Sequence, residues 1–113
     1  MAIVTNAIKM GRFGFMSNSQ SADVSAIETL VAAPGVGKSI VVDQIILNST
    51  DAISLMIGEG AWTTLLGPLA FSALLTLQWD FRSRGGMVLT SNTLLAIDGD
   101  AGQINCFVAG RVI

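Results

Sequence analysis

The sequence predicts an all-β protein, an antiparallel β-sandwich of the jelly-roll kind with an extended N-terminal arm. Apolar and polar side chains alternate with a period of two, most clearly from Leu75 to Phe81, which is the pattern of a strand with one buried face. Turn residues separate such segments about every 8–12 residues, a spacing typical of a sandwich or a small barrel. The 3.6-residue period of an amphipathic helix is scarce in this chain.

The composition is that of a folded domain that associates with other proteins. A length of 113 residues suits one domain. A hydrophobic content of 51% excludes a disordered chain, because burial of so much apolar surface offsets the entropy of ordering. Charged residues make up only 12%, about half of the usual share. Because so little polar surface is available to cover a lone domain, we expect an oligomer or a docked subunit.

Residues 1–25 are predicted to form the N-terminal arm, and residues 26–113 the β-sandwich domain. The arm combines a short apolar start, a glycine-containing stretch and a polar stretch, a composition typical of a flexible joint. Phe13, Phe15 and Met16 lie close together there, with the two aromatics on one side of an extended chain. We interpret them as candidate interface residues. The arm either packs on its own domain or adds to the sheet of a neighbour.

The strands of the sandwich are predicted from β-branched, alternating segments and the turns between them. The first strand ends at a turn that begins at Pro34, and Gly67 and Pro68 are expected to end a short strand. Gly85 and Gly86 predict a hairpin-type connection, because paired glycines supply the positive φ angles of a tight reversal. The predicted strands span residues 26–32, 39–47, 52–57, 62–66, 73–81, 87–89, 93–97 and 103–112.

The segment from Gly60 to Trp79 has no charged residue over twenty positions, which is long enough to span a bilayer. Gly67 and Pro68 interrupt it, and its second half has the period of a strand. We therefore predict no contact with a membrane.

The charge and the cysteine content narrow the class of protein further. A net charge of −2 without any run of like charges disfavours nucleic-acid binding, which needs a basic stripe. The single Cys106 excludes an internal disulfide, and its apolar neighbours indicate a small buried hydrophobe. Together with the lack of a signal-peptide pattern at the start of the sequence, this predicts synthesis in a reducing cytoplasm.

The segment from Ala32 to Ser39 ends in the Gly-Lys-Ser of a phosphate-binding loop. Its first position is alanine where the motif requires glycine, and a predicted strand follows where the motif requires a helix. We interpret it as a turn between two strands.

The segment from Asp98 to Gly102 has the alternating carboxylates of a calcium loop. It is too short, and no glutamate closes a twelve-residue loop. Asp-Gly is itself a hairpin signal, so we predict a hairpin turn and no metal site.

Catalysis is not predicted. The chain has no histidine, Cys106 lacks a base, and the carboxylates are scattered. Asp43 and Asp80 are expected at outward strand positions or in ion pairs with Arg82 or Arg84. We expect no catalytic residue, no cofactor and no nucleotide.

Arg82 and Arg84 form the only local basic cluster, beside two glycines. They are either a solvated hairpin tip or candidate interface residues for an acidic patch on a neighbouring protein. Trp62 and Trp79 are predicted to be core or interface anchors rather than a sugar platform.

Four segments carry a resemblance to a known family: residues 27–42, the strand and turn that end at Gly60, residues 85–97, and the closing residues 104–112. In this order of strands and turns, residues 26–113 resemble the small β-sandwich head decoration (cement) proteins of tailed bacteriophages and their relatives in necks and tail fibres. The family contributes no catalytic residues.

The resemblance implies a homotrimer on the capsid surface of a virion, made in the host cytoplasm. Such a structural protein binds the major capsid protein and stabilises the shell. Related folds also serve elsewhere in the virion, so fold alone does not fix the role. The alternative is a phage neck or tail-fibre binding module that recognises a protein or carbohydrate receptor.

Overall fold

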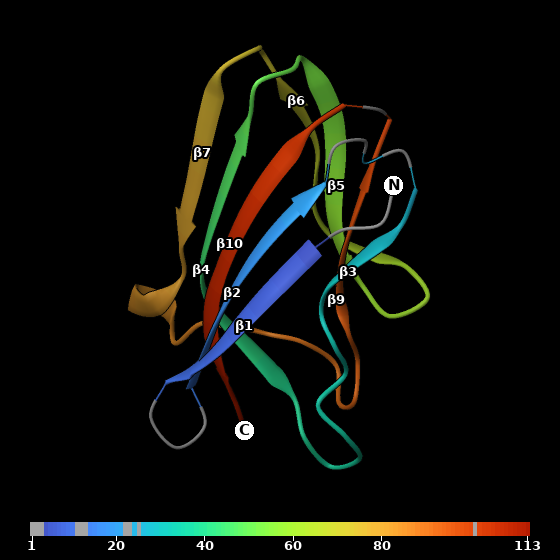
Figure 1. The fold of residues 1–113 in the computed structure, drawn as a ribbon. Helices are drawn as coiled ribbons and strands as arrows, with labels where there is room; N and C mark the ends of the chain where they lie inside the picture. The colour runs from blue at the N-terminus through green and yellow to red at the C-terminus, as the bar shows by residue number, and fades with distance from the viewer. Residues whose placement is uncertain (1–3, 11–13, 22–23, 25, 101) are drawn as a thin grey trace.

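The computed structural model describes residues 4–10, 14–21, 24, 26–100 and 102–113 and confirms the predicted antiparallel β-sandwich. Two sheets face each other (Figure 1). The larger sheet has the strand order β1-β2-β10-β4-β7, with β8 also paired to β4, and the smaller sheet has the order β3-β9-β5-β6. The strands of the larger sheet are β1 (Val4–Met10), β2 (Gly14–Ser21), β10 (Ile104–Val112), β4 (Ile40–Ser49), β7 (Leu75–Asp80) and β8 (Met87–Val88). Those of the smaller sheet are β3 (Glu28–Val31), β9 (Leu95–Gly99), β5 (Ile53–Glu59) and β6 (Thr63–Phe71).

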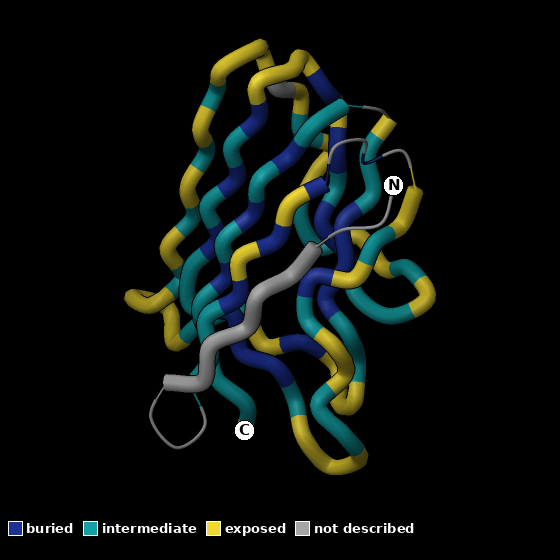
Figure 2. Tube along the Cα trace, viewed as in Figure 1, coloured by how far each residue is buried: buried dark blue, intermediate teal, exposed yellow. Residues whose placement is uncertain are grey.

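The core lies between the two sheets and consists of alternate residues of the central strands (Figure 2). On β10, buried residues alternate with half-buried ones along the whole strand up to Gly110, as a sheet with one covered face requires. Each fully buried leucine or isoleucine contributes about 1.5–3 kcal/mol relative to an exposed one. The fully buried aliphatic side chains include Ile40, Ile45, Leu47, Leu55, Ile57, Leu95, Ile97 and Ile104.

Strand β4 is the centre of the larger sheet, because it pairs with β10 on one edge and with β7 and β8 on the other. Its β-branched residues suit a pleated, buried strand. The register shifts between Ala109 and Gly110, so that Asp43 has no partner residue on β10. This β-bulge places the Asp43 carboxylate beside Arg111.

The N-terminal segment lies differently from the predicted arm. Strand β2 pairs with β10 along its full length, and β1 pairs with β2. The inward residues of β2 are the buried Ser17, Ser19 and Ser21, and the Ser17 hydroxyl donates a 3.3 Å hydrogen bond to the carbonyl oxygen of Leu30 on β3. A polar stretch therefore fits the interior face because serine is small and its hydroxyl can bond to backbone. Residues 14–21 are a strand of the sandwich.

The hairpin predicted at the paired glycines is wrong. Strands β7 and β8 pair with the same edge of β4 and run in the same direction, so the chain does not reverse between them. Instead, residues 81–86 loop out of one interrupted edge strand and include the 3₁₀ helix η1 (Arg82–Arg84). The amide of Gly86 closes this loop with a 2.9 Å hydrogen bond to the Phe81 carbonyl oxygen. The positive φ angles of Gly85 and Gly86 shape a bulging loop rather than a turn between neighbours.

The strand end predicted at Gly67 and Pro68 is also wrong. Strand β6 continues through both residues to Phe71, with a cis peptide bond between them and an irregular register on β5. Proline is tolerated here because β6 is the last strand in the order of its sheet, where one side of the backbone needs no partner.

We predict that Gly110→Ala lowers the free energy of unfolding by about 3 kcal/mol. A Cβ atom at this position would overlap the Val41 carbonyl oxygen and lie 3.0 Å from Cζ of Phe15. The Val41 oxygen is a backbone atom, which cannot move without disturbing the larger sheet. Urea denaturation measures the effect.

The matched control is Gly85→Ala. A Cβ atom there meets nothing within 4 Å, so only its left-handed backbone opposes the change, at about 1 kcal/mol. Equal losses for the two variants would contradict the close approach of β10 to β4.

Candidate functional site

Two of the three interface candidates of the N-terminal segment are described, and they lie on opposite faces of β2. Phe13 lies outside the described residues. Phe15 packs partly buried against the core of its own domain, above Gly110. Met16 is half-buried and follows the alternation to the opposite, outer face of β2, where it lies across from Ala109.

Arg82 and Arg84 lie on the loop that leaves the edge of the larger sheet. The Arg82 guanidinium forms a bidentate ion pair with Asp80. Its Nε donates to Oδ1 at 2.9 Å, and its Nη2 donates to Oδ2 at 2.6 Å. Mainly through these side-chain hydrogen bonds, Arg82 lowers the pKa of Asp80 from 3.8 to about 2. Arg84 is exposed at the end of η1. The expected ion pair of Asp80 therefore forms within the chain.

Asp43 forms the second ion pair, with Arg111 rather than with the arginines of the loop. Nη1 of Arg111 donates to Oδ1 of Asp43 at 2.6 Å, while Nη2 donates to the carbonyl oxygen of Gly85 at 2.9 Å. The Arg111 guanidinium thus connects the bulge of β4 to the loop of residues 81–86. Its role is to fix the end of the sheet.

The outer face of the larger sheet carries rows of uncharged polar side chains. In one row Gln20, Asn105, Asn48 and Thr76 are successive cross-strand partners. Asn48 is fixed there, because its Nδ2 donates to Thr76 Oγ1 at 2.8 Å and its Oδ1 accepts a 3.5 Å bond from Asn105 Nδ2. Cross-strand pairs of this kind stabilise a sheet.

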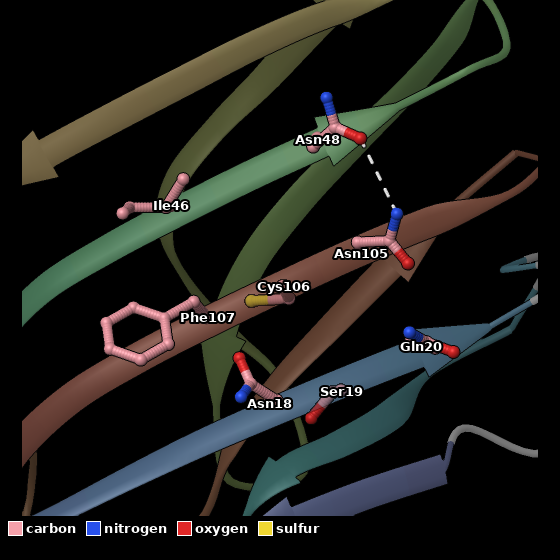
Figure 3. Close-up of a pocket in the computed structure, with 8 residues that line it drawn as sticks. All are labelled: Asn18, Ser19, Gln20, Ile46, Asn48, Asn105, Cys106 and Phe107. Carbon is pink, nitrogen blue, oxygen red and sulfur yellow. Dashed lines mark hydrogen bonds between the residues drawn. The ribbon is translucent and has the colours of Figure 1, made fainter.

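The adjacent row places an aromatic ring among the amides. Phe107 lies across from Asn18 on β2 and from Ile46 on β4, and both apolar side chains are half-buried. An open depression of about 310 Å³ lies over this part of the sheet (Figure 3). We call it the amide face; its lining residues are Asn18, Ser19, Gln20, Ile46, Asn48, Asn105, Cys106 and Phe107.

The sequence analysis missed the amide face because its side chains come from three strands far apart in the chain. The available signal was an amide at an outward position of several strands, such as Asn18, Asn48 and Asn105. Only the cross-strand register shows that these positions are neighbours.

Cys106 is the sulfur-containing residue in the lining of the amide face. The prediction that it is a small buried hydrophobe is confirmed. Its side chain is 3% exposed and is a free thiol. Burial raises the pKa of Cys106 to about 12, so the thiol stays protonated and unreactive.

The segment that resembles a phosphate-binding loop is a turn, as predicted. Strand β4 begins directly after Ser39, with no helix to face a phosphate, and the amide of Gly35 donates to Oδ1 of Asn92.

The hairpin predicted at the calcium-like segment is wrong. Asp98 belongs to β9, and Asp100 Oδ1 accepts a hydrogen bond from the Ser54 amide. Strands β9 and β10 lie in different sheets, so the chain crosses from one sheet to the other here.

The two tryptophans occupy different sites. Trp79 packs partly buried against the core from β7. Trp62 is half-buried, and its Nε1 donates to Thr64 Oγ1 at 2.9 Å.

We predict that the Asp80 carboxyl titrates with a midpoint near pH 2 and that Arg82→Gln moves the midpoint up toward 3.8. Because the folded-state pKa is lowered, the pair stabilises the fold fully above pH 3.8 and loses its effect as the pH falls through 2. The carboxyl carbon resonance of Asp80 in an NMR titration measures the midpoint. Arg84→Gln is the control and leaves the midpoint in place; an equal shift in both variants would contradict the ion pair.

Comparison of the chain with protein-family models, with curated proteins and with solved structures gave no match. Within the residues that the structure describes, no helix is long and apolar enough to cross a membrane. The same residues contain no group of three histidine, cysteine or acidic side chains arranged to hold a metal ion. A functional assignment therefore rests on the surfaces of the molecule.

Proposed function

We propose that this chain is a non-enzymatic structural protein of a virion, a homotrimer that decorates a phage head and reinforces it by binding the major capsid protein. The observation that carries the proposal is an exposed apolar surface at one end of the sandwich. Val36, Val88 and Ile113 are exposed by 90%, 58% and 61%. We call these three residues the apolar end.

The backbone contacts bring the apolar end together. Ser39, three residues after Val36, exchanges two 2.9 Å hydrogen bonds with Ile113, and Val88 pairs with Val41 two residues further along. In Figure 1 the C-terminus and the turn before β4 both lie at the lower end of the sandwich. We infer that these three exposed apolar side chains belong to one association surface.

The turn that carries Val36 is held in place before any partner binds. The Asn92 side chain accepts a 3.0 Å hydrogen bond from the Gly35 amide, and the Asn92 amide donates to the Lys38 carbonyl oxygen at 2.7 Å. A preformed surface loses less conformational entropy on binding. This suits a protein that clamps a shell.

The low charge of the chain supports the same proposal. Burial of the apolar end against other copies, and against the shell, contributes about 25 cal/mol per Å² of apolar area. Phe15 is occupied by its own core, so we assign the subunit contact to the apolar end instead of the N-terminal segment. We infer the capsid as the partner from the resemblance to decoration proteins.

We predict that the purified chain has a native mass of three times 11.8 kDa and that Val36→Asp converts it to a monomer. A carboxylate buried in the subunit contact would lack a partner and oppose association. Light scattering after size exclusion measures the mass of both proteins at the same concentration.

The matched control is Leu74→Asp, which removes an apolar side chain that is 78% exposed in the turn between β6 and β7, at the other end of the sandwich. Leu74 has a φ of 63°, which aspartate tolerates, so this variant stays trimeric. A monomeric wild type would refute the trimer. Failure to cosediment with heads of the virus whose genome encodes the chain would refute the capsid as its partner.

A further inference from the structure

We propose that the amide face is a binding site for a neutral saccharide. The site lies on the outer face of the larger sheet, over β2, β10 and β4. It is built from other residues than the apolar end, so the proposal stands apart from the proposed role in the virion.

The hydrogen-bonding chemistry of the lining fits sugar hydroxyls. A carboxamide both donates and accepts, and so does a hydroxyl group. Asn48 and Asn105 are linked to each other and to Thr76, which fixes their orientation. Asn18 and Gln20 are exposed on β2 along the rim, so their amides face solvent from the opposite side of the depression. A ligand between the two strands would meet amides on both sides.

The floor of the site supplies an apolar platform. Phe107 lies in the middle strand, β10, between Asn18 and Ile46 in the cross-strand register. Figure 3 shows its ring extending along the strand, at the same end of the site as Ile46 and away from Asn105 and Gln20. The C–H face of a pyranose ring packs against such a ring while the hydroxyl groups at its edge reach the amides. Polar groups placed around an aromatic surface fix the orientation of a small ligand.

The charges around the site favour a neutral ligand. None of the eight lining residues is charged. Among the described side chains of the larger sheet, Asp80 is engaged by Arg82 and Arg111 by Asp43. An anionic ligand would lose hydration on binding, and no cationic side chain in the lining would compensate for that loss.

The size of the site favours a small ligand over a protein surface. A depression of about 310 Å³ is at the lower limit for small-molecule sites and holds roughly one or two sugar rings. A stable protein interface needs a wider face with an apolar centre, whereas this depression combines amides with two apolar side chains, Phe107 and Ile46.

The test is an NMR titration of the full chain, labelled with ¹⁵N, against glucose, galactose, mannose, N-acetylglucosamine, maltose, lactose and chitobiose. We expect saturable shifts of the side-chain amides of Asn18, Asn48 and Asn105 with at least one of these sugars. Glucuronic acid serves as the charged counterpart and should bind less tightly than glucose.

Two variants and one matched control assign the binding to the site. Phe107→Ala should weaken binding about tenfold through loss of the apolar platform, whereas Phe107→Tyr should retain it. Asn18→Asp changes an exposed position without altering its size, so it keeps the fold and should weaken binding by removing two donors. The control Gln44→Ala lies on the same face of β4 outside the lining and should leave the affinity unchanged.

Several results would overturn the proposal. One is the absence of saturable shifts with the whole panel; another is binding that Phe107→Ala and Asn18→Asp leave intact. If the amide signals change with protein concentration in the absence of sugar, the face is a contact between copies instead. The trimer is tested separately by Val36→Asp, so the failure of one proposal is distinguishable from the failure of the other.

Discussion

The register between β4 and β10 is the constraint on which the rest of this structure depends. It places Ile45 opposite Val108, and both are buried in the core. The same register places Ile46 opposite Phe107 on the outer face. Because side chains alternate along a strand, a slip of one residue would exchange the two faces and bury the amides. The core and the candidate binding site are therefore set by one pairing.

Two ion pairs and one bulge anchor the lower end of that pairing. At the β-bulge, the Asp43 carboxylate accepts a hydrogen bond from Arg111. The same guanidinium also donates to the Gly85 carbonyl oxygen in the loop. Arg82, in the same loop, forms an ion pair with Asp80 at the end of β7. The charges of this region are thus used to shape the sheet edge. The lining of the amide face, by contrast, contains no charged residue.

Local patterns predicted most strands but not the way they connect. The alternation from Leu75 to Asp80 and the β-branched run of β4 identify strands because each reflects the burial of one face. Gly85 and Gly86 predict a reversal, yet positive φ angles fit a bulged loop equally well. Pro68 predicts a strand end, but an edge strand tolerates proline. The polar serines of the N-terminal segment predict an arm, although Ser17 bonds to the backbone of β3.

The sequence by itself determined the fold class, the burial of Cys106 and the shortage of charge, because each depends on composition or on neighbours along the chain. Only the tertiary structure decided which strands pair. That choice placed Asn18, Asn48, Asn105 and Phe107 at one depression and brought the segments of Val36, Val88 and Ile113 together. Pairing in this antiparallel sandwich is non-local, with partners as distant in the chain as Gly14 and Arg111. A site assembled across strands therefore leaves no continuous motif in the sequence.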